Sequence, residues 1–257
     1  MLVFFKCRVL PCYLPVCALW ALCFALGLGG CATQSTATSP LSPASTAAQQ
    51  DTWMQWQHFA FPGKRATEFK AQYIDGRYAM AVTSDNAASM LRHKLRVEPA
   101  DLNQLMFSWK VPALIDIADM AVRESDDSPV RIVLAFDGDR STFSGRNYRT
   151  NEMMKLLTGE EMPYATLMYV WSNTHAVGTI INGSRTDRIR KIVVEQGKPH
   201  LNQWREYERD IRADYTKAYG EPPGALIGIA LMTDTDNTHS QTKAWYGKVS
   251  LSGPVAR

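Results

Sequence analysis

Short apolar segments separated by turn residues constrain the fold of this chain more than any other feature. From Trp53 onward, alternating or β-branched segments follow one another, and turn residues break them at close intervals. This pattern is typical of an antiparallel sandwich or barrel. Strands are predicted at 54–61, 67–74, 77–84, 88–97, 103–111, 130–137, 165–172, 176–181, 187–195, 225–233 and 243–252. We therefore expect a mainly β fold, an antiparallel β-sandwich with one or two covering helices.

Two details of the strand pattern make sharper predictions. In 130–136, Val130, Ile132 and Leu134 share one face, and the opposite face is also largely apolar, which indicates an inner strand. Asp75-Gly76 and Asn182-Gly183 each lie between strand-like runs, and such pairs suit tight hairpins that need positive φ.

Helical spacing appears in two segments. In 201–219, apolar side chains recur every three or four residues, Glu208 and Arg212 are spaced for an i,i+4 pair, and Gly220 follows as a stop. A shorter helix is predicted at 150–157, ending at Gly159. These helices are expected to cover a sheet edge or the mouth of a sandwich.

The N-terminus resembles a bacterial lipoprotein signal peptide. Lys6 and Arg8 precede an apolar run from about residue 9 to 28, and Gly29-Gly30-Cys31 closes that run. In such signals the cysteine is acylated and becomes the first residue after cleavage, so residues 1–30 are predicted to be removed and Cys31 to be the lipidation site. Ala32 follows it, and by the same resemblance the outer membrane, facing the periplasm, is favoured. A single transmembrane anchor is the alternative, because about 20 apolar residues can span a bilayer.

Composition separates a tether from a single folded body. Residues 31–52 are almost entirely Ala, Thr, Ser, Pro and Gln, which is typical of a disordered tether. Residues 53–253 are expected to form one domain, since about 200 residues suit a single β-sandwich.

The folded body carries no cysteine and almost no net charge. All five cysteines lie within the first 31 residues, which excludes disulfides, Cys-based zinc sites and a cysteine nucleophile in the body. Without residues 1–30 the chain has 26 Lys and Arg against 25 Asp and Glu. This balance gives no electrostatic footprint for nucleic acid.

Several motifs together resemble one bacterial family, domain of unknown function 3047. The most specific is Met232-Thr233-Asp234-Thr235-Asp236-Asn237-Thr238, and it is followed by Tyr246-Gly247. Further matches are Phe61-Pro62-Gly63-Lys64, Trp109-Lys110-Val111 and Phe136-Asp137-Gly138-Asp139. Lys248 departs from the acidic residue expected after Tyr-Gly, which weakens a cation site there. The resemblance implies no activity. By analogy of fold, the strand content resembles jelly-roll modules that bind carbohydrate.

Acidic residues gather in two predicted loops. Asp119, Asp126 and Asp127 precede one strand, and Asp234, Asp236 and Asn237 follow another. Calcium takes six to eight oxygen ligands from loops of this kind, so a structural Ca²⁺ ion held by Asp119, Asp126, Asp127, Asp234 and Asp236 is one interpretation. The alternative is that these side chains bond backbone amides in turns, with Asp126 or Asp127 pairing Arg131.

Aromatic residues provide a candidate binding surface. Trp109 and Trp171 lie within strands and are expected in the core, whereas Trp245 and Tyr246 follow the Asp234 loop. Sugar rings stack on exposed aromatic faces. Asp234, Asp236, Asn237, Trp245 and Tyr246 are therefore the candidate ligand-binding residues.

These observations leave three functions open. The first is a lipid-anchored, non-catalytic module that binds glycan or another polymer of the cell envelope. The second is a carboxylate-dependent glycan hydrolase or lyase, which would need two converging acids. The third is a scaffold that contacts other envelope proteins.

Overall fold

The structure of the protein is a computed structural model that describes Trp53 and residues 55–252. The predicted signal peptide, the tether and the lipidation site Cys31 lie outside the described residues. Within the described part, no helix is long and apolar enough to cross a membrane.

The described strands are β1 (Gln57–Ala60), β2 (Glu68–Ile74), β3 (Arg77–Asp85), β4 (Ala88–Val97), β5 (Gln104–Lys110), β6 (Ser128–Phe136), β7 (Ala165–Ser172), β8 (Ile180–Asn182), β9 (Ile189–Gln196), β10 (Trp204–Asp210), β11 (Leu226–Asp234), β12 (Gln241–Tyr246) and β13 (Ser250–Leu251). The helices are α2 (Gly145–Thr158) and α3 (Ile211–Tyr219), with short 3-10 turns η1 (Arg123–Ser125) and η2 (Arg140–Thr142).

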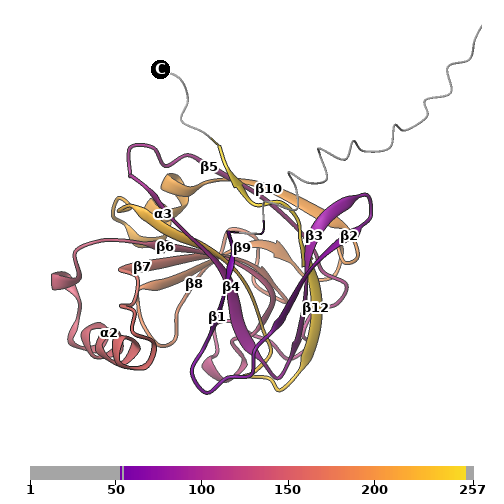
Figure 1. Ribbon diagram of the computed structural model, residues 1–257, viewed down its shortest axis with the longest axis horizontal. Helices are drawn as coiled ribbons and strands as arrows, with labels where there is room; N and C mark the ends of the chain where they lie inside the picture. The colour runs from indigo at the N-terminus through magenta and orange to yellow at the C-terminus, as the bar shows by residue number, and fades with distance from the viewer. Residues whose placement is uncertain (1–52, 54, 253–257) are drawn as a thin grey trace, which may run out of the picture. The chain divides into compact units, whose positions relative to one another are not determined.

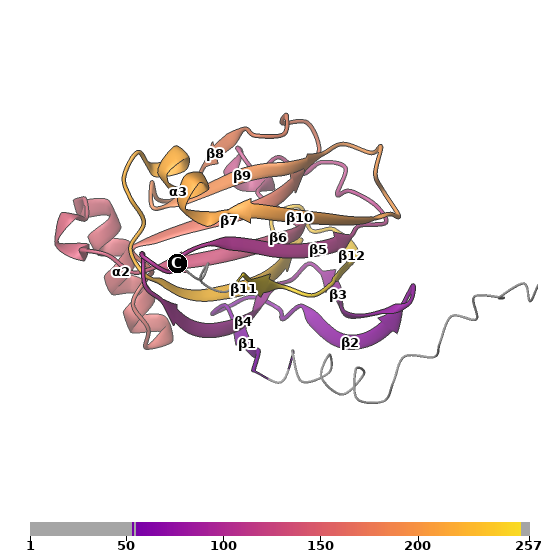
Figure 2. The same cartoon turned by 90° about the horizontal axis from the view of Figure 1, so that it is seen from above.

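These strands form two sheets (Figures 1 and 2). The larger has the order β1-β4-β11-β6-β7-β9-β8, and the second has the order β10-β5-β12-β3-β2, with β13 pairing β5. Every pair is antiparallel except β7 with β9, which is parallel and was not foreseen. The predicted mainly β sandwich is therefore confirmed, and β6 is an inner strand between β11 and β7 as expected.

The main core lies between the two sheets. Leu134 and Leu167 of the larger sheet belong to the same buried cluster as Leu105 and Phe107 of the second sheet. Trp109 and Trp171 also lie in this cluster, as predicted. Because each strand alternates its side chains, the other face of the larger sheet is free to form a different surface.

Both predicted hairpins form, but only one of them has the tight turn that was expected. Asp75 and Gly76 join β2 to β3 with φ of 50° and 77°. Gly183, by contrast, begins a connection of residues 183–188 between β8 and β9, and its amide donates to the Ile189 carbonyl. A Cβ at Gly183 would lie 2.8 Å from the Thr186 carbonyl oxygen, so close backbone approach explains this glycine.

The predicted helix at 201–219 is wrong in its first half. Trp204–Asp210 is strand β10, which pairs antiparallel with β5, and only Ile211–Tyr219 is helical. Strand pairing prevails because Glu206 and Glu208 alternate with more buried neighbours, a period of two that also fits the sequence. Asp210 then caps α3 by accepting a hydrogen bond from the Ala213 amide.

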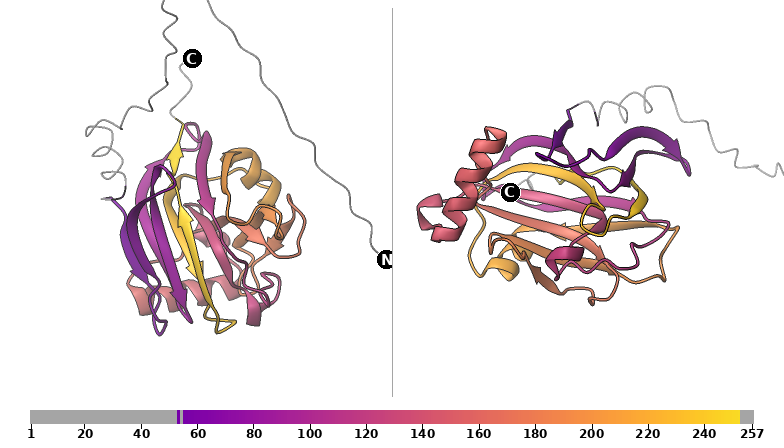
Figure 3. Two further views of the ribbon diagram at one scale, coloured as in Figure 1. Left: turned by 90° about the vertical axis from the view of Figure 1, so that its right-hand side faces the viewer. Right: turned by 90° about the horizontal axis from the view of Figure 1, so that it is seen from below.

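The second predicted helix is longer than expected. Helix α2 begins after the cap Ser144, whose hydroxyl accepts from the Asn147 amide, and ends at Gly159 as predicted. Its axis crosses the strand direction at one end of the larger sheet (Figure 3). In Figures 1 and 2 it lies on the opposite side from β2, β3 and β12.

Candidate binding cleft

A cleft of about 530 Å³ lies on the outer face of the larger sheet, the face turned away from the second sheet. Side chains of the floor stand in cross-strand rows, namely Phe59, Met90, Met232 and Arg131; Arg92, Ala230, Val133, Met168 and Lys191; and Gly228, Ala135, Thr166 and Ile189. A volume of this size falls within the ~300–1,000 Å³ typical of small-molecule sites.

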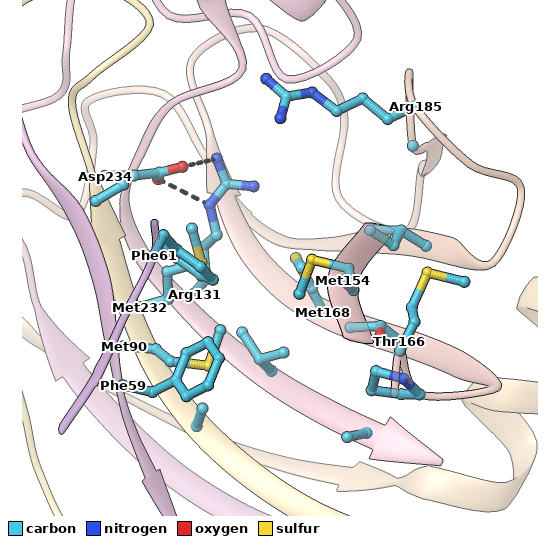
Figure 4. Close-up of a pocket in the computed structure, with 18 of the residues that line it drawn as sticks. Phe59, Phe61, Met90, Arg131, Met154, Thr166, Met168, Arg185, Met232 and Asp234 are labelled. Atoms are coloured by element: carbon cyan, nitrogen blue, oxygen red, sulfur yellow. Dashed lines mark hydrogen bonds and ion pairs between the residues drawn. The ribbon is translucent and has the colours of Figure 1, made fainter. Parts of the chain in front are cut away.

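Three segments form the walls of the cleft. Phe59 and Phe61 stand on β1 and the turn after it, and Met154 projects from α2 on the other side (Figure 4). The connection at 183–188 contributes Arg185, which Figure 4 shows above the Met168 floor position. Methionine side chains adapt to irregular ligands, because they are unbranched and polarizable. The cleft therefore presents a deformable apolar lining.

A buried ion network closes one end of the cleft. Arg131 donates from Nε and Nη2 to the two carboxylate oxygens of Asp234, each at 2.9 Å. The same Nη2 lies 3.2 Å from Oδ1 of Asp126, whose Oδ2 accepts from Lys191 Nζ at 2.6 Å. Arg131 and Lys191 are each only 2% exposed. Two cations and two carboxylates thus neutralise one another beside an apolar floor.

Burial and pairing act in opposite directions on this network. Burial alone lowers the pKa of Arg131, but the charges of Asp234 and Asp126 outweigh it and hold that pKa above its ordinary value. Burial likewise raises the pKa of Asp126, yet Arg131 and Lys191 bring it below its ordinary value. For Asp234, full burial raises the pKa against the pull of Arg131. The network is therefore held together by pairing and would be costly to break.

The Asp234 loop meets the Asp127 loop, as a cation site would require. Carboxylate oxygens of Asp127, Asp234 and Asp236 lie within 4.8 Å of one another. Each already has partners: Asp127 accepts from the Thr238 amide at 2.7 Å, Asp234 pairs Arg131, and Asp236 pairs Lys64. The amide hydrogen bond to Asp127 is of the kind given above as the alternative to calcium, whereas the ion pairs of Asp234 with Arg131 and of Asp236 with Lys64 were not foreseen.

The remaining predicted residues are placed apart from one another. Asn237 lines the cleft and donates to the Asp126 carbonyl at 3.1 Å. Asp119 accepts from the Ala121 amide and lies 2.9 Å from His175 Nε2, and its carboxylate is not among the three that gather. Trp245 lies on β12 of the second sheet. The Nζ atoms of Lys110 and Lys243 lie 5.8 and 4.9 Å from its ring centre.

Tyr246 is fully buried and belongs to the core, so it offers no stacking surface. Its hydroxyl accepts from the Arg131 amide at 3.0 Å and donates to the Met232 carbonyl. Tyr246 therefore fixes the backbone beneath the cleft. The structure brings Asp126, Asp234, Asp236 and Asn237 to one end of the cleft and leaves Trp245 and Tyr246 out of it.

Glu160 marks the other end of the cleft. It accepts from Arg92 at 2.6 and 3.0 Å and from Lys94 at 2.8 Å. The hydrogen bonds from Arg92 and Lys94 lower the pKa of Glu160 to about 2. This carboxylate therefore stays ionised at neutral pH.

Two exposed cations in the lining have no such partner. Arg123 in η1 and Arg185 in the 183–188 connection both line the cleft, and neither forms a hydrogen bond or ion pair with any described residue. Their guanidinium groups could donate hydrogen bonds to an anionic group of a ligand whose remainder lies on the apolar floor.

Sequence reasoning missed the residues that make the floor. Met90, Met168 and Met232 were predicted within strands, but nothing identified them as neighbours, because they come from three strands far apart in the chain. Lys191 was missed for the same reason. The sequence did contain a signal for the ion network, because an arginine such as Arg131 within an otherwise apolar inner strand needs a buried partner.

Comparisons with known proteins define the family of this chain but no activity. A family model described as "Protein of unknown function (DUF3047)" matches residues 54–250, and no curated protein matches. Solved structures with some similarity include the xyloglucanase domain of NopAA, a type three effector from Sinorhizobium fredii in complex with cellobiose (10% identity, 77% of this chain, 92% of that chain, TM-score 0.41). Another is endoglucanase 3 of family GH12 from Trichoderma harzianum (8% identity, 77% and 95% coverage, TM-score 0.43). At these values the likeness supports no inference about ligand or chemistry.

Proposed function

The chain belongs to the family described as DUF3047, and from its geometry we propose that it is a non-catalytic binding protein whose cleft holds an apolar part of a ligand. The lining of the cleft supports this proposal. Its floor is built by methionine, valine, alanine and phenylalanine side chains, whereas its buried charged groups are already paired. Apolar surface with few free polar groups favours an apolar ligand over one rich in hydroxyls.

The proposal differs from the sequence expectation in the class of ligand. Glycan binding would use exposed aromatic faces together with free Asp and Asn side chains. In the cleft, Asp234 and Asp236 are held by Arg131 and Lys64, and Trp245 is on the other sheet. A glycan, or another polymer of the envelope, stays the alternative ligand.

The paired carboxylates argue against the hydrolase alternative. A glycosidase needs a general acid with a raised pKa that can reach the substrate. Glu160 has a pKa of about 2, and the pKa of Asp126 is also lowered. Burial raises the pKa of Asp234, but this carboxylate is 4% exposed and both its oxygens accept from Arg131. A scaffold role has no observation that favours it over binding.

A fluorescence titration tests the binding proposal. The probe is N-phenyl-1-naphthylamine, a neutral apolar dye, and we expect one saturable site. Ala135→Phe should weaken the affinity at least about tenfold, or ~1.4 kcal/mol, because the new ring occupies the floor beside Gly228, which has no side chain. Ala71→Phe, at an exposed position of β2 on the second sheet, is the matched control and should leave the affinity unchanged.

The opposite pattern would contradict the proposal. If the dye does not bind, and cellohexaose instead raises the melting temperature of the wild type but not of Ala135→Phe, the cleft is a glycan site. If the dye binds equally to wild type and Ala135→Phe, the cleft is not the binding site.

We also propose that the protein is anchored in the outer membrane through an acylated Cys31, facing the periplasm. This rests on the N-terminal sequence alone. Metabolic labelling with an alkyne analogue of palmitate should label the wild type and Cys23→Ser, but not Cys31→Ser. Continued labelling of Cys31→Ser would overturn the anchor.

A further inference from the structure

Helix α2 buries polar side chains and exposes apolar ones. Asn147 and Asn151 are 2% and 5% exposed, whereas Met153 and Leu156 are 56% and 81% exposed. A surface helix ordinarily has the reverse arrangement, with its apolar stripe against the core. The described part of the chain therefore supplies no cover for the apolar face of α2.

Hydrogen bonds fix this orientation of the helix. Asn147 donates from Nδ2 to Asp187 at 2.6 Å and accepts from the Thr186 hydroxyl at 2.8 Å. One turn later, Asn151 accepts from the Met162 amide at 2.9 Å. Rotating α2 to bury its apolar side chains would break these bonds and leave the buried Met162 amide without its acceptor, which is costly. The exposed face is thus a built feature of the fold.

The exposed face combines apolar and basic side chains in one stripe. Arg146, Arg149, Met153 and Leu156 follow one another at spacings of three, four and three residues, so they lie on the same side of the helix. All four are exposed. Arg149 has no partner among the described residues, and Arg146 donates to a backbone carbonyl, so no carboxylate pairs with either guanidinium.

We propose that this face of α2 docks on an anionic lipid surface. Exposed apolar side chains bind a membrane interface through burial, and Arg or Lys side chains beside them are attracted to anionic headgroups. The stripe has both components. The neighbouring flank of the same helix reaches the cleft, where Met154 and Leu157 line the wall. An apolar path therefore runs from the docked face to the cleft, although docking does not require the cleft to be filled.

Oxidative footprinting of the full chain tests this docking face. The chain is mixed with vesicles of phosphatidylglycerol or of phosphatidylcholine, and hydroxyl-radical oxidation is followed by mass spectrometry. Met153 should become several-fold less reactive with phosphatidylglycerol and stay reactive with phosphatidylcholine. Met106, which is 39% exposed on β5, is the internal control and should not change. An N-terminal anchor would hold the chain on both kinds of vesicle, so the difference reports on α2.

Substitutions on the helix sharpen the test. Leu156→Asp and Arg149→Glu should each abolish the protection of Met153 while leaving the melting temperature unchanged, because both side chains are exposed. Val177→Asp, at a 60% exposed apolar position between β7 and β8, is the matched control and should retain protection. Ala135→Phe should retain it as well, which separates docking from binding in the cleft.

Three results would overturn the proposal. Equal protection of Met153 by phosphatidylcholine would show that docking does not depend on anionic headgroups. No protection of Met153 by either lipid would show that α2 does not dock on a lipid surface. Protection without lipid that increases with protein concentration would identify a second copy of the chain as the partner.

Discussion

The two faces of the larger sheet carry side chains of different character on the same strands. On β6, Ile132 and Leu134 point into the core between the sheets, while Arg131 and Val133 point to the cleft. The inner face is packed against the second sheet, including the ring of Phe107 stacked 5.5 Å from that of Tyr169. Among the described residues no sheet covers the outer face, which is bordered by a loop, a turn and α2.

This difference separates side chains enclosed between the two sheets from side chains that border the cleft. Inner-face side chains lose contacts with many neighbours when they are shortened, since interiors are close-packed. Outer-face side chains border an open cleft, and the charged ones are neutralised locally. Binding specificity can therefore vary on one face without rebuilding the other.

The largest effect should come from breaking the ion network. Arg131→Met should lower the free energy of unfolding by about 3–5 kcal/mol, because it leaves the buried carboxylate of Asp234 without its cation. Urea denaturation measures this. The double variant Arg131→Met/Asp234→Asn should lose less, since no unpaired charge is buried at Asp234. A single-variant loss below ~1 kcal/mol would mean that the outer face contributes little to stability.

A second pair of variants compares the faces directly. Leu134→Ala should cost about 2–5 kcal/mol, because it leaves a cavity in the closed core. Val133→Ala, next along β6, should cost only about 1–2 kcal/mol, because the removed methyl groups border the cleft rather than an enclosed space. Equal losses at 133 and 134 would show that the outer face is as closely packed as the inner one.

A smaller effect should depend on pH. Glu160 has a pKa of about 2 in the folded protein against an ordinary value of 4.5, so its stabilisation is fully present above pH 4.5 and is lost as pH falls through 2. Because the side chain is 37% exposed, we expect under ~1 kcal/mol. The difference in unfolding free energy between wild type and Glu160→Gln should be positive at pH 6 and vanish near pH 2. A difference that grows on acidification would contradict the assigned ion pairs.

The smallest effect concerns calcium. The carboxylates of Asp127, Asp234 and Asp236 already have amide, Arg131 and Lys64 partners. We therefore expect the same melting temperature in calcium and in chelator. A rise in calcium that Asp236→Asn abolishes would restore the calcium site that the sequence allowed.

The sequence predicted the strands well because alternation and turn residues are local signals. Residues 88–97 and 165–172 were predicted with the bounds observed for β4 and β7. Strand β10 was missed because Trp204 and Tyr207 also fit helical spacing, and only pairing with β5 decides between the two. The parallel β7–β9 pair depends on the same kind of long-range contact.

The candidate site was only partly predictable. The sequence left open whether the Asp126 and Asp234 loops meet, and in the structure Arg131 joins the two. The cleft floor could not be foreseen, since Met90, Met168 and Met232 become neighbours only through the strand order. The exposed apolar face of α2 could not be predicted either, because it also depends on contacts between distant segments. Its buried asparagines are identified by their partners in other segments, not by the helix itself.

Methyl NMR of methionine tests the central claim, that apolar ligands bind on the outer face, most directly. With ¹³C-methyl methionine in the full chain, N-phenyl-1-naphthylamine should shift the resonances of Met90, Met168 and Met232, which line the cleft. The resonances of Met80, in the core, and Met106, on the second sheet, should stay in place. Shifts confined to Met106, or no shift at all at saturating dye, would contradict the account.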